Sequence, residues 1–304
     1  MKTKNIIIIL LLVSISCFAQ QEAQYTQYMY NTTNINPAYA GNRGILSVFG
    51  LHRTQWVGLD GAPTTNAFSI NTPIVNSNVG MGLSFINDNI GASNENIISA
   101  DISYAIPTSE TFRLSFGLKA TANLLNIDYS KLNQYDSFDS KFQNNVNNKF
   151  TPNLGAGVYF NSDKLYLGFS IPNFFDAANF NDDIAETVNQ KMHYYFIGGY
   201  VFDLSSKVKF KPAFLTKAVE GSPLQLDLSG NFLFNDKFVL GAAWRWNAAA
   251  SMMAGFQITD GLFAGYGYDL ETTNLKHYNS GSHEIFLRFE LFKKPEKVIS
   301  PRFF

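Results

Sequence analysis

The residue types that most often carry chemistry are sparse in this chain and lie far apart. The histidines stand at positions 52, 193, 277 and 283, and the one cysteine at position 17. Metal sites and acid–base pairs need several such groups close together, and only His283 has a carboxylate, Glu284, directly beside it. Adjacent residues of an extended strand point to opposite faces, so these two do not form a pair. The spacing predicts polar structural roles for the histidines and no metal site.

The remaining chemical signals are equally weak. Asp182 and Asp183 lie in an asparagine-rich stretch that favours a solvated loop, and a calcium role stays open although no EF-hand spacing is present. The sequence has no G-x-S-x-G elbow, phosphate-binding loop or H-E-x-x-H motif. We therefore predict no enzyme, no catalytic residue and no cofactor. The open alternative is a barrel phospholipase or protease whose serine or acid meets a histidine only in the folded chain.

Residues 112–124, FRLSFGLKATANL, alternate between two kinds of side chain without a break. Every even position holds Phe, Leu or Ala, and every odd position holds a polar residue or glycine. A period of two is typical of a β-strand with one apolar and one polar face. The pattern recurs along the whole chain, which favours an all-β fold. Its strands suit a barrel wall with one face toward lipid and the other toward the interior.

Runs of this kind, bounded by turn residues, predict about fourteen strands. They centre on residues 45–56, 64–73, 79–88, 95–106, 111–125, 150–160, 164–172, 192–203, 207–217, 223–234, 237–246, 250–258, 261–270 and 283–292.

The connections between these strands alternate in length. The longest follow odd-numbered strands, at 128–149, 173–191 and 271–282. Those after even-numbered strands are short, at 107–110, 161–163, 235–236 and 259–261. A barrel with both termini in the periplasm has short periplasmic turns and long outer loops in this order. A secreted β-sandwich would share the alternation without sorting its loops. We therefore predict an antiparallel transmembrane β-barrel of outer-membrane type.

The N-terminus carries an export signal. Two lysines precede an apolar run over residues 6–15, and small residues up to Ala19 suit a cleavage site. The run is shorter than the ~20 residues of a spanning helix, so we expect a signal peptide, residues 1–19, that is cut after Ala19. Acylation of Cys17 is less favoured, because no aliphatic residue stands three positions before it.

Cleavage would remove the only cysteine and two lysines. The mature chain would then lack thiol chemistry, and its acidic residues would exceed its basic ones by three. This charge gives no support to nucleic-acid binding. The chain also holds 28 Phe and 15 Tyr, more aromatic surface than a core of this size needs, which interfacial girdles in a membrane would explain.

One membrane domain accounts for most of the chain. We expect the barrel over residues 44–292, after an N-terminal segment, residues 20–43, that is periplasmic or plugs the barrel. A periplasmic tail, residues 293–304, follows. The charged residues predicted to face inward have both signs, which suits a filled lumen at least as well as a pore. They are Asp101, Arg113, Lys119, Lys207, Lys209, Lys211, Asp227, Arg245, Asp269, Glu284, Arg288 and Glu290.

Several local motifs are more specific than the architecture. They are an N-P-A-x-x-G element (Asn36, Pro37, Ala38, Gly41), an R-x-Q-W element (Arg53, Gln55, Trp56) and the terminal Ser300, Pro301, Arg302, Phe303 and Phe304. Together with the run over residues 150–173, these motifs resemble the PorP/SprF family of type IX secretion outer-membrane proteins of Bacteroidota. The resemblance covers essentially the whole mature chain in the same order.

The resemblance implies a non-enzymatic accessory barrel of the type IX secretion system in the cell outer membrane. Its partners would be outer-membrane lipid, other secretion components and a large exported surface protein, commonly an adhesin. The barrel would help to hold that protein at the surface through its C-terminal sorting domain, in gliding bacteria for motility. The residues alone leave two alternatives open: a passive or ligand-specific porin, and a structural barrel linking the membrane to the periplasm.

Two of these motifs have open roles. Arg53 and Trp56 lie near the upper end of the first strand and could bind a partner, although Trp56 suits an interfacial anchor better. Phe303 and Phe304 follow Pro295, which ends the last strand, and they are apolar groups that need a contact. They either dock against another secretion component or fold back on the lower rim of the barrel.

Overall fold

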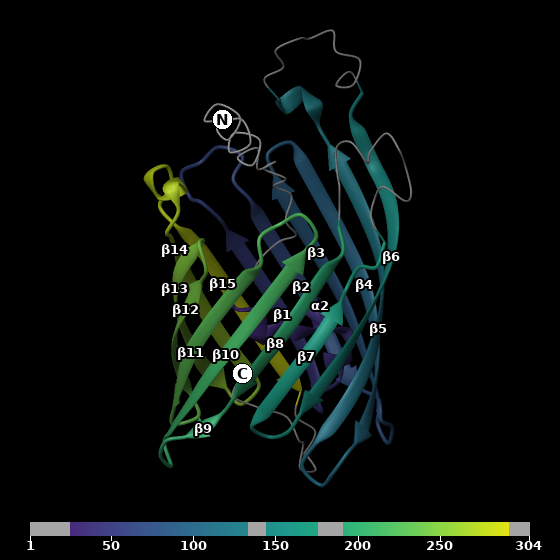
Figure 1. Cartoon of the computed structure of the whole chain (residues 1–304), viewed down its shortest axis with the longest axis vertical. Coiled ribbons are helices and arrows are strands. Elements are labelled where there is room, and N and C mark those ends of the chain that lie inside the picture. The colour runs from purple at the N-terminus through teal and green to yellow at the C-terminus, as the bar shows by residue number, and fades with distance from the viewer. Residues whose placement is uncertain (1–24, 133–143, 176–190, 292–304) are drawn as a thin grey trace, which may run out of the picture.

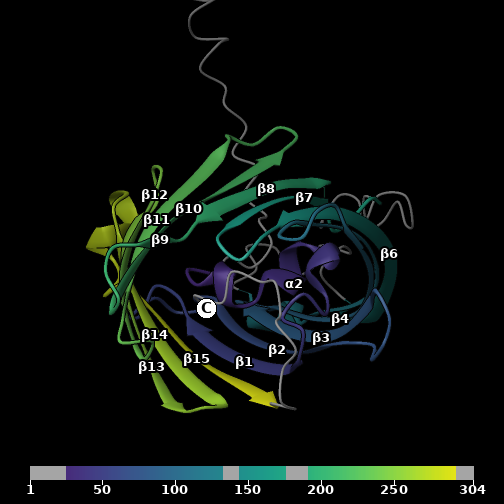
Figure 2. The same cartoon turned by 90° about the horizontal axis from the view of Figure 1, so that it is seen from below.

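The computed structural model describes residues 25–132, 144–175 and 191–291, which form one closed antiparallel β-barrel (Figures 1 and 2). Strand β15 pairs with β1, and every other neighbouring pair is consecutive or is separated only by β9. Because β9 (Phe202–Asp203) continues β8 (His193–Tyr200) after one residue, the barrel has fourteen strands. The predicted fold class is confirmed.

The predicted strand limits lie within two residues of the observed ones, except that β6 begins four residues earlier. The remaining strands are β1 (Leu46–Thr54), β2 (Thr64–Pro73), β3 (Val79–Ile90), β4 (Ser93–Pro107), β5 (Arg113–Ile127), β6 (Val146–Asn161), β7 (Leu165–Ile171), β10 (Val208–Val219), β11 (Gln225–Phe234), β12 (Phe238–Arg245), β13 (Ala249–Thr259), β14 (Leu262–Glu271) and β15 (Ser282–Leu291).

The break between β8 and β9 has a cause on the neighbouring strand. Ala213 pairs with Gly199 and Phe210 with Phe202, so Pro212 lies opposite the break. Proline has no N–H to donate to a ladder. By register Pro212 lies opposite Tyr200, so one bond of the β8–β10 ladder is lost and the single run predicted over 192–203 is divided in two. On its other side, toward β7, Val201 still donates its backbone N–H to the Lys164 carbonyl, 2.8 Å away.

The two faces of the wall differ as the alternation predicts. On β5, Phe116 and Leu118 point outward and keep 47% and 61% of their surface exposed, whereas Ser115 and Lys119 point inward and are buried. Outward apolar residues on every side of a closed sheet suit a lipid environment. Aromatic residues are not confined to this outer face, because a set of them packs inside the barrel. This set includes Tyr28, Tyr30, Phe49, Tyr159, Tyr166, Tyr195, Phe263 and Phe286.

The connections sort to opposite ends of the barrel (Figure 1). At one end, here called the turn end, all are short: 74–78, 108–112, 162–164, 204–207, 235–237 and 260–261. The other end, here called the loop end, has the longest connections, including 55–63 and 272–281. Leu46 pairs with Leu291, so the barrel strands begin and finish at the turn end. Within the described ranges, no helix is long and apolar enough to span a membrane.

Candidate functional site

The lumen holds the stretch before β1, here called the plug segment, residues 25–44 (Figure 2). It contains three short helical turns, η1 (Tyr28–Tyr30), α2 (Thr32–Ile35) and η2 (Pro37–Tyr39). Its first residues contact the loop-end parts of β1, β14 and β15. Its last residues reach the turn end, where Asn42 bonds to Asn161 and Arg43 to Glu290. The plug segment therefore runs along the lumen from one end to the other.

The N-P-A-x-x-G element fixes the middle of the plug segment to the wall. The buried Asn36 amide donates to the Val158 carbonyl at 3.0 Å, and its Oδ1 accepts from the Ala38 N–H at 2.9 Å. Pro37 starts η2, where the missing N–H of proline costs nothing. These contacts explain why the sequence needs an amide followed by proline at this point.

Inward glycines of the wall make room for this element. A Cβ at Gly117 would lie 2.2 Å from the Ala38 nitrogen, and one at Gly80 would lie 2.1 Å from the Ala40 carbonyl oxygen. Gly41 has a left-handed backbone (φ +69°), and its own Cβ would lie 2.7 Å from the Gly80 Cα. The wall and the plug segment thus touch backbone to backbone, which only glycine permits.

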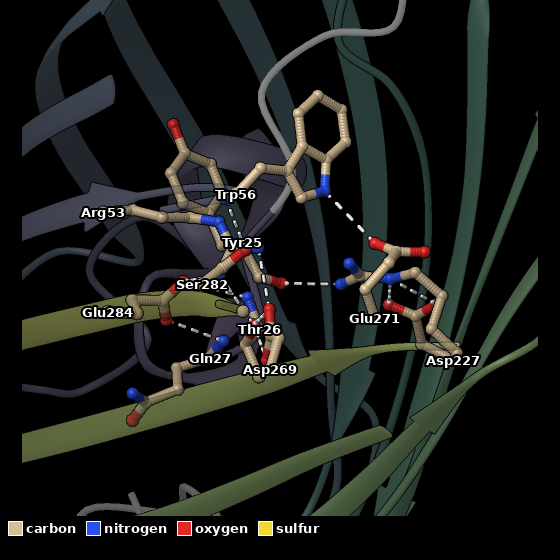
Figure 3. Close-up of polar contacts among 12 residues, drawn as sticks. Tyr25, Thr26, Gln27, Arg53, Trp56, Asp227, Asp269, Glu271, Ser282 and Glu284 are labelled. Atoms are coloured by element: carbon tan, nitrogen blue, oxygen red, sulfur yellow. Dashed lines mark hydrogen bonds and ion pairs between the residues drawn. The ribbon is translucent and has the colours of Figure 1, made fainter. Parts of the chain in front are cut away.

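Arg53, Asp269 and Glu284 form a buried charged group, here called the latch, at the loop end (Figure 3). Arg53 Nη2 lies 2.7 Å from Asp269 Oδ2, and Arg53 Nη1 lies 3.2 Å from Glu284 Oε2. At most 4% of each side chain is exposed. Charges this deeply buried are stable only when they are paired and hydrogen-bonded.

The plug segment supplies the hydrogen bonds that complete the latch. Thr26 donates its hydroxyl to Asp269 at 2.6 Å and its N–H to Glu284 at 3.0 Å, and Gln27 donates its N–H to the other Glu284 oxygen at 2.9 Å. Arg53 in turn donates to the Thr26 hydroxyl at 2.9 Å. Two carboxylates with one guanidinium leave an excess of negative charge, which these N–H and O–H donors stabilise.

A second ion pair and the rim continue this network. Arg245 Nε lies 3.0 Å from Asp227 Oδ2, and Arg245 also donates to the Tyr25 carbonyl at 3.5 Å. At the rim, the Trp56 indole donates to Glu271 at 3.1 Å. Gln55 closes the 55–63 connection by donating its N–H to the Pro63 carbonyl at 2.9 Å.

The lumen keeps a cavity of about 100 Å³ on the loop-end side of the plug segment. Tyr25, Tyr28, Asn34 and Ile35 of the plug segment line one side of it. The wall adds charged residues of both signs, namely Asp88, Glu95, Lys119, Lys217, Asp227 and Arg245. A mixed lining of this kind selects no single charge of ligand.

Most of the charged residues predicted to face inward do so. Nine are buried within the lumen, and Lys119 pairs with Asp101 at 3.0 Å. Arg113 is half-buried near the turn end, and Lys209 pairs at 2.8 Å with the exposed Asp236 of a turn. Lys207 does not face the lumen, because it lies exposed in the 204–207 turn. The inward positive and negative side chains thus mainly neutralise one another in ion pairs inside the barrel.

The motifs predicted as site residues do not form one site. The N-P-A-x-x-G element lies in the lumen toward the turn end, whereas Arg53 joins the latch and Trp56 the rim at the loop end. Ser300, Pro301, Arg302, Phe303 and Phe304, like Asp182 and Asp183, fall outside the described residues. In the part of the chain that the structure describes, no three His, Cys, Asp or Glu residues lie close enough to hold a metal.

Comparison with known proteins agrees with this architecture. The solved structures that resemble the chain include "CymD monoaromatic hydrocarbon channel" (11% identity, 87% of this chain and 94% of that one, TM-score 0.51). Another is "TodX deltaS2S3 mutant monoaromatic hydrocarbon channel" (8% identity, 88% of this chain and 94% of that one, TM-score 0.52). At such identities the likeness shows the fold alone. No curated protein matches the chain.

The sequence itself matches one family over most of its length. The family model described as "Type IX secretion system membrane protein PorP/SprF" matches residues 17–289. The family is non-enzymatic, which agrees with the lack of catalytic motifs in the sequence. This outer-membrane β-barrel therefore belongs to the PorP/SprF family of type IX secretion system membrane proteins.

Proposed function

We propose that this protein is a closed accessory barrel of the type IX secretion system that helps to hold a large exported surface protein at the outer membrane. The partner would be adhesin-like and would be bound through its C-terminal sorting domain. The observation that carries the proposal is the plug segment, which extends through the lumen and is fastened at both ends by buried polar contacts.

A permeation channel needs a continuous aqueous path, and the interior of this barrel offers little room for one. Tyr30 of the plug segment stacks on Phe263, with ring centroids 5.4 Å apart, and Tyr39 packs edge-on against Tyr159 at 5.3 Å. These rings join residues of the plug segment to opposite parts of the wall. A lumen packed in this way supports a role in binding other proteins over a role in transport of solutes.

The loop end is the surface that we expect the partner to contact. Long connections are the usual carriers of binding residues on a rigid barrel, and here they share one end. Trp56 adds an aromatic group at the same rim, where its backbone N–H bonds to the Ser282 hydroxyl at 3.1 Å. We place this end at the cell surface and the turn end in the periplasm.

Surface proteomics of intact cells tests the proposal. Loss of this protein should remove one large sorting-domain protein from the cell surface and leave the other exported proteins in place. The missing partner's sorting domain, given an affinity tag, should recover the barrel from wild-type membranes. An unchanged set of surface proteins would contradict the anchoring role.

A further inference from the structure

The outer face of the barrel wall carries a groove of about 590 Å³, here called the outer groove, which crosses the neighbouring strands β4, β5, β6 and β7 (Figure 1). Two rows of outward side chains form its sides. The row nearer the turn end is Tyr104, Phe116, Val158 and Phe169, one residue from each strand. These four residues pair in register, so the row runs straight across the wall.

The second row of the outer groove lies two residues farther from the turn end on each strand. It consists of Ile102, Leu118, Ala156 and Ile171, which again pair in register. Ala156 carries only a methyl group, whereas its partners on both sides carry branched side chains of four carbons. Of the four strands, β6 therefore fills the least space above the wall and leaves the most room for a ligand.

The floor of the outer groove is backbone. Ser103, Gly117 and Gly157 lie between the two rows and pair in register, and their side-chain positions point into the lumen. Inside, the Ser103 hydroxyl donates to the Ala40 carbonyl at 2.7 Å, and the two glycines contact the plug segment. The wall here is thus one backbone thick, with the plug segment packed on its inner side.

The lining determines which chemistry the outer groove can bind. Among the described residues that line it, none is charged, and the one outward polar group is the Tyr104 hydroxyl. Such a surface binds through apolar contact and offers almost no hydrogen bonds. The outer groove also runs from Val79 of β3, which pairs with Tyr104, to β7. Four strand spacings of about 4.8 Å give a length of about 19 Å, which suits a long, unbranched apolar ligand.

The surroundings of the outer groove supply such a ligand. The groove is continuous with the lipid-facing surface of an outer-membrane barrel, so hydrocarbon is the medium in contact with it. Phe116 lies three residues from the first residue of β5, and Phe169 lies four from the first residue of β7. The nearer row is therefore about 10–13 Å along the strands from their turn-end limits. Because the hydrocarbon core is about 30 Å thick, the outer groove lies in the leaflet at the turn end.

From these observations we infer that the outer groove holds one acyl chain of a phospholipid as a bound ligand, distinct from the freely exchanging lipid around the barrel. The acyl chain lies between the two rows and covers the backbone at Gly117 and Gly157. It packs against the outer side of the wall whose inner side holds the N-P-A-x-x-G element. Phospholipid fills the periplasmic leaflet of an outer membrane, and this choice of lipid rests on the orientation proposed above.

Photolabelling of the full-length protein in phospholipid bilayers tests the inference. The probe is phosphatidylethanolamine with a photoreactive diazirine on one acyl chain. In the wild type, the label should concentrate on residues 116–118 and 156–158, whereas freely exchanging lipid would label the outer face evenly. Ala156→Phe fills the outer groove and should reduce this label about tenfold, the loss expected when about two CH₂ groups can no longer be buried. Ala254→Phe is the matched control, because Ala254 faces outward on β13, away from the groove, and should keep the wild-type pattern.

Even labelling of the outer face in the wild type would overturn the inference, and so would a wild-type pattern in Ala156→Phe. If Ala156→Phe does not fold, Ala156→Leu repeats the test with a smaller side chain. Mass spectrometry of the barrel purified from outer membranes in mild detergent identifies the lipid. One retained phospholipid in the wild type supports the inference, whereas lipopolysaccharide in its place, or no lipid, overturns it. The bilayers contain no partner protein, so the labelling result is independent of the proposed anchoring role.

Discussion

Asn36 and Gly157 meet inside the barrel with no space between them for a side chain. A Cβ at position 157 would lie 2.1 Å from the Asn36 Oδ1, although the two residues are 121 positions apart. The Asn36 amide, which caps the start of η2, therefore fills the space that a side chain at position 157 would need. The relationship shows how the wall and the plug segment are shaped for each other, and it makes the fit testable by adding one methyl group.

Gly157→Ala should destabilise the barrel by about 1–3 kcal/mol, because overpacking forces the plug segment or β6 to shift. Gly50→Ala is the matched control, since a Cβ at Gly50 meets nothing within 4 Å. Heat-modifiable migration on gels gives the unfolding temperature of each. Equal stability of the two variants would contradict the tight fit.

Loss of the latch arginine should weaken the hold on the plug segment. Arg53→Gln leaves two buried carboxylates beside Thr26 without their cation, and breaking such a buried pair costs about 3–5 kcal/mol. We expect a lower unfolding temperature and faster proteolysis within residues 25–44. As a control, Lys164→Gln breaks an ion pair with Asp203 that is about half exposed, and this should change stability little.

A charge on the outer face should damage the barrel through its contact with lipid. Phe116→Arg places a guanidinium on the apolar face of β5, three residues after its first residue, Arg113, and an arginine on this face costs up to about 2–4 kcal/mol at the bilayer centre and less toward the interface. Phe116→Leu keeps the face apolar and should fold normally. If both variants gave the same yield of folded barrel in outer membranes, the assignment of the lipid face would be wrong.

Epitope tags can establish the orientation. A tag inserted after Lys131, in the 128–145 connection, should be reachable by antibody on intact cells, whereas a tag in the 108–112 turn should be reachable only after permeabilisation. Labelling in the reverse pattern would place the loop end in the periplasm and exclude a partner-binding role for it at the surface.

The strands could be predicted from the sequence because their signal is local. A period of two is contained within each strand, so the sequence predicts β2 with the limits that the structure shows, Thr64–Pro73. The interruption at Val201 has no such local signal, because it depends on Pro212, a residue of the neighbouring strand. The aromatic content favours membrane girdles, but rings such as Tyr30 and Phe286 fill the lumen, which the composition cannot reveal.

The latch was only partly visible in the sequence. Arg53 stood out within a motif, and Asp269 and Glu284 lay on predicted inward faces, but their contact joins residues more than 200 positions apart. Thr26 and Gln27 gave no signal of their own, because they act through backbone N–H groups and one hydroxyl. The one available clue was that buried carboxylates require donors from some other segment.

Planar-bilayer recording of the purified full-length barrel tests most directly the claim that it is closed. We predict no steady conductance from the wild type, because the plug segment runs from Thr26 at the loop end to Arg43 at the turn end. Arg53→Gln should give intermittent openings as the latch loosens. A stable open-channel conductance from the wild type would contradict the account and favour a porin.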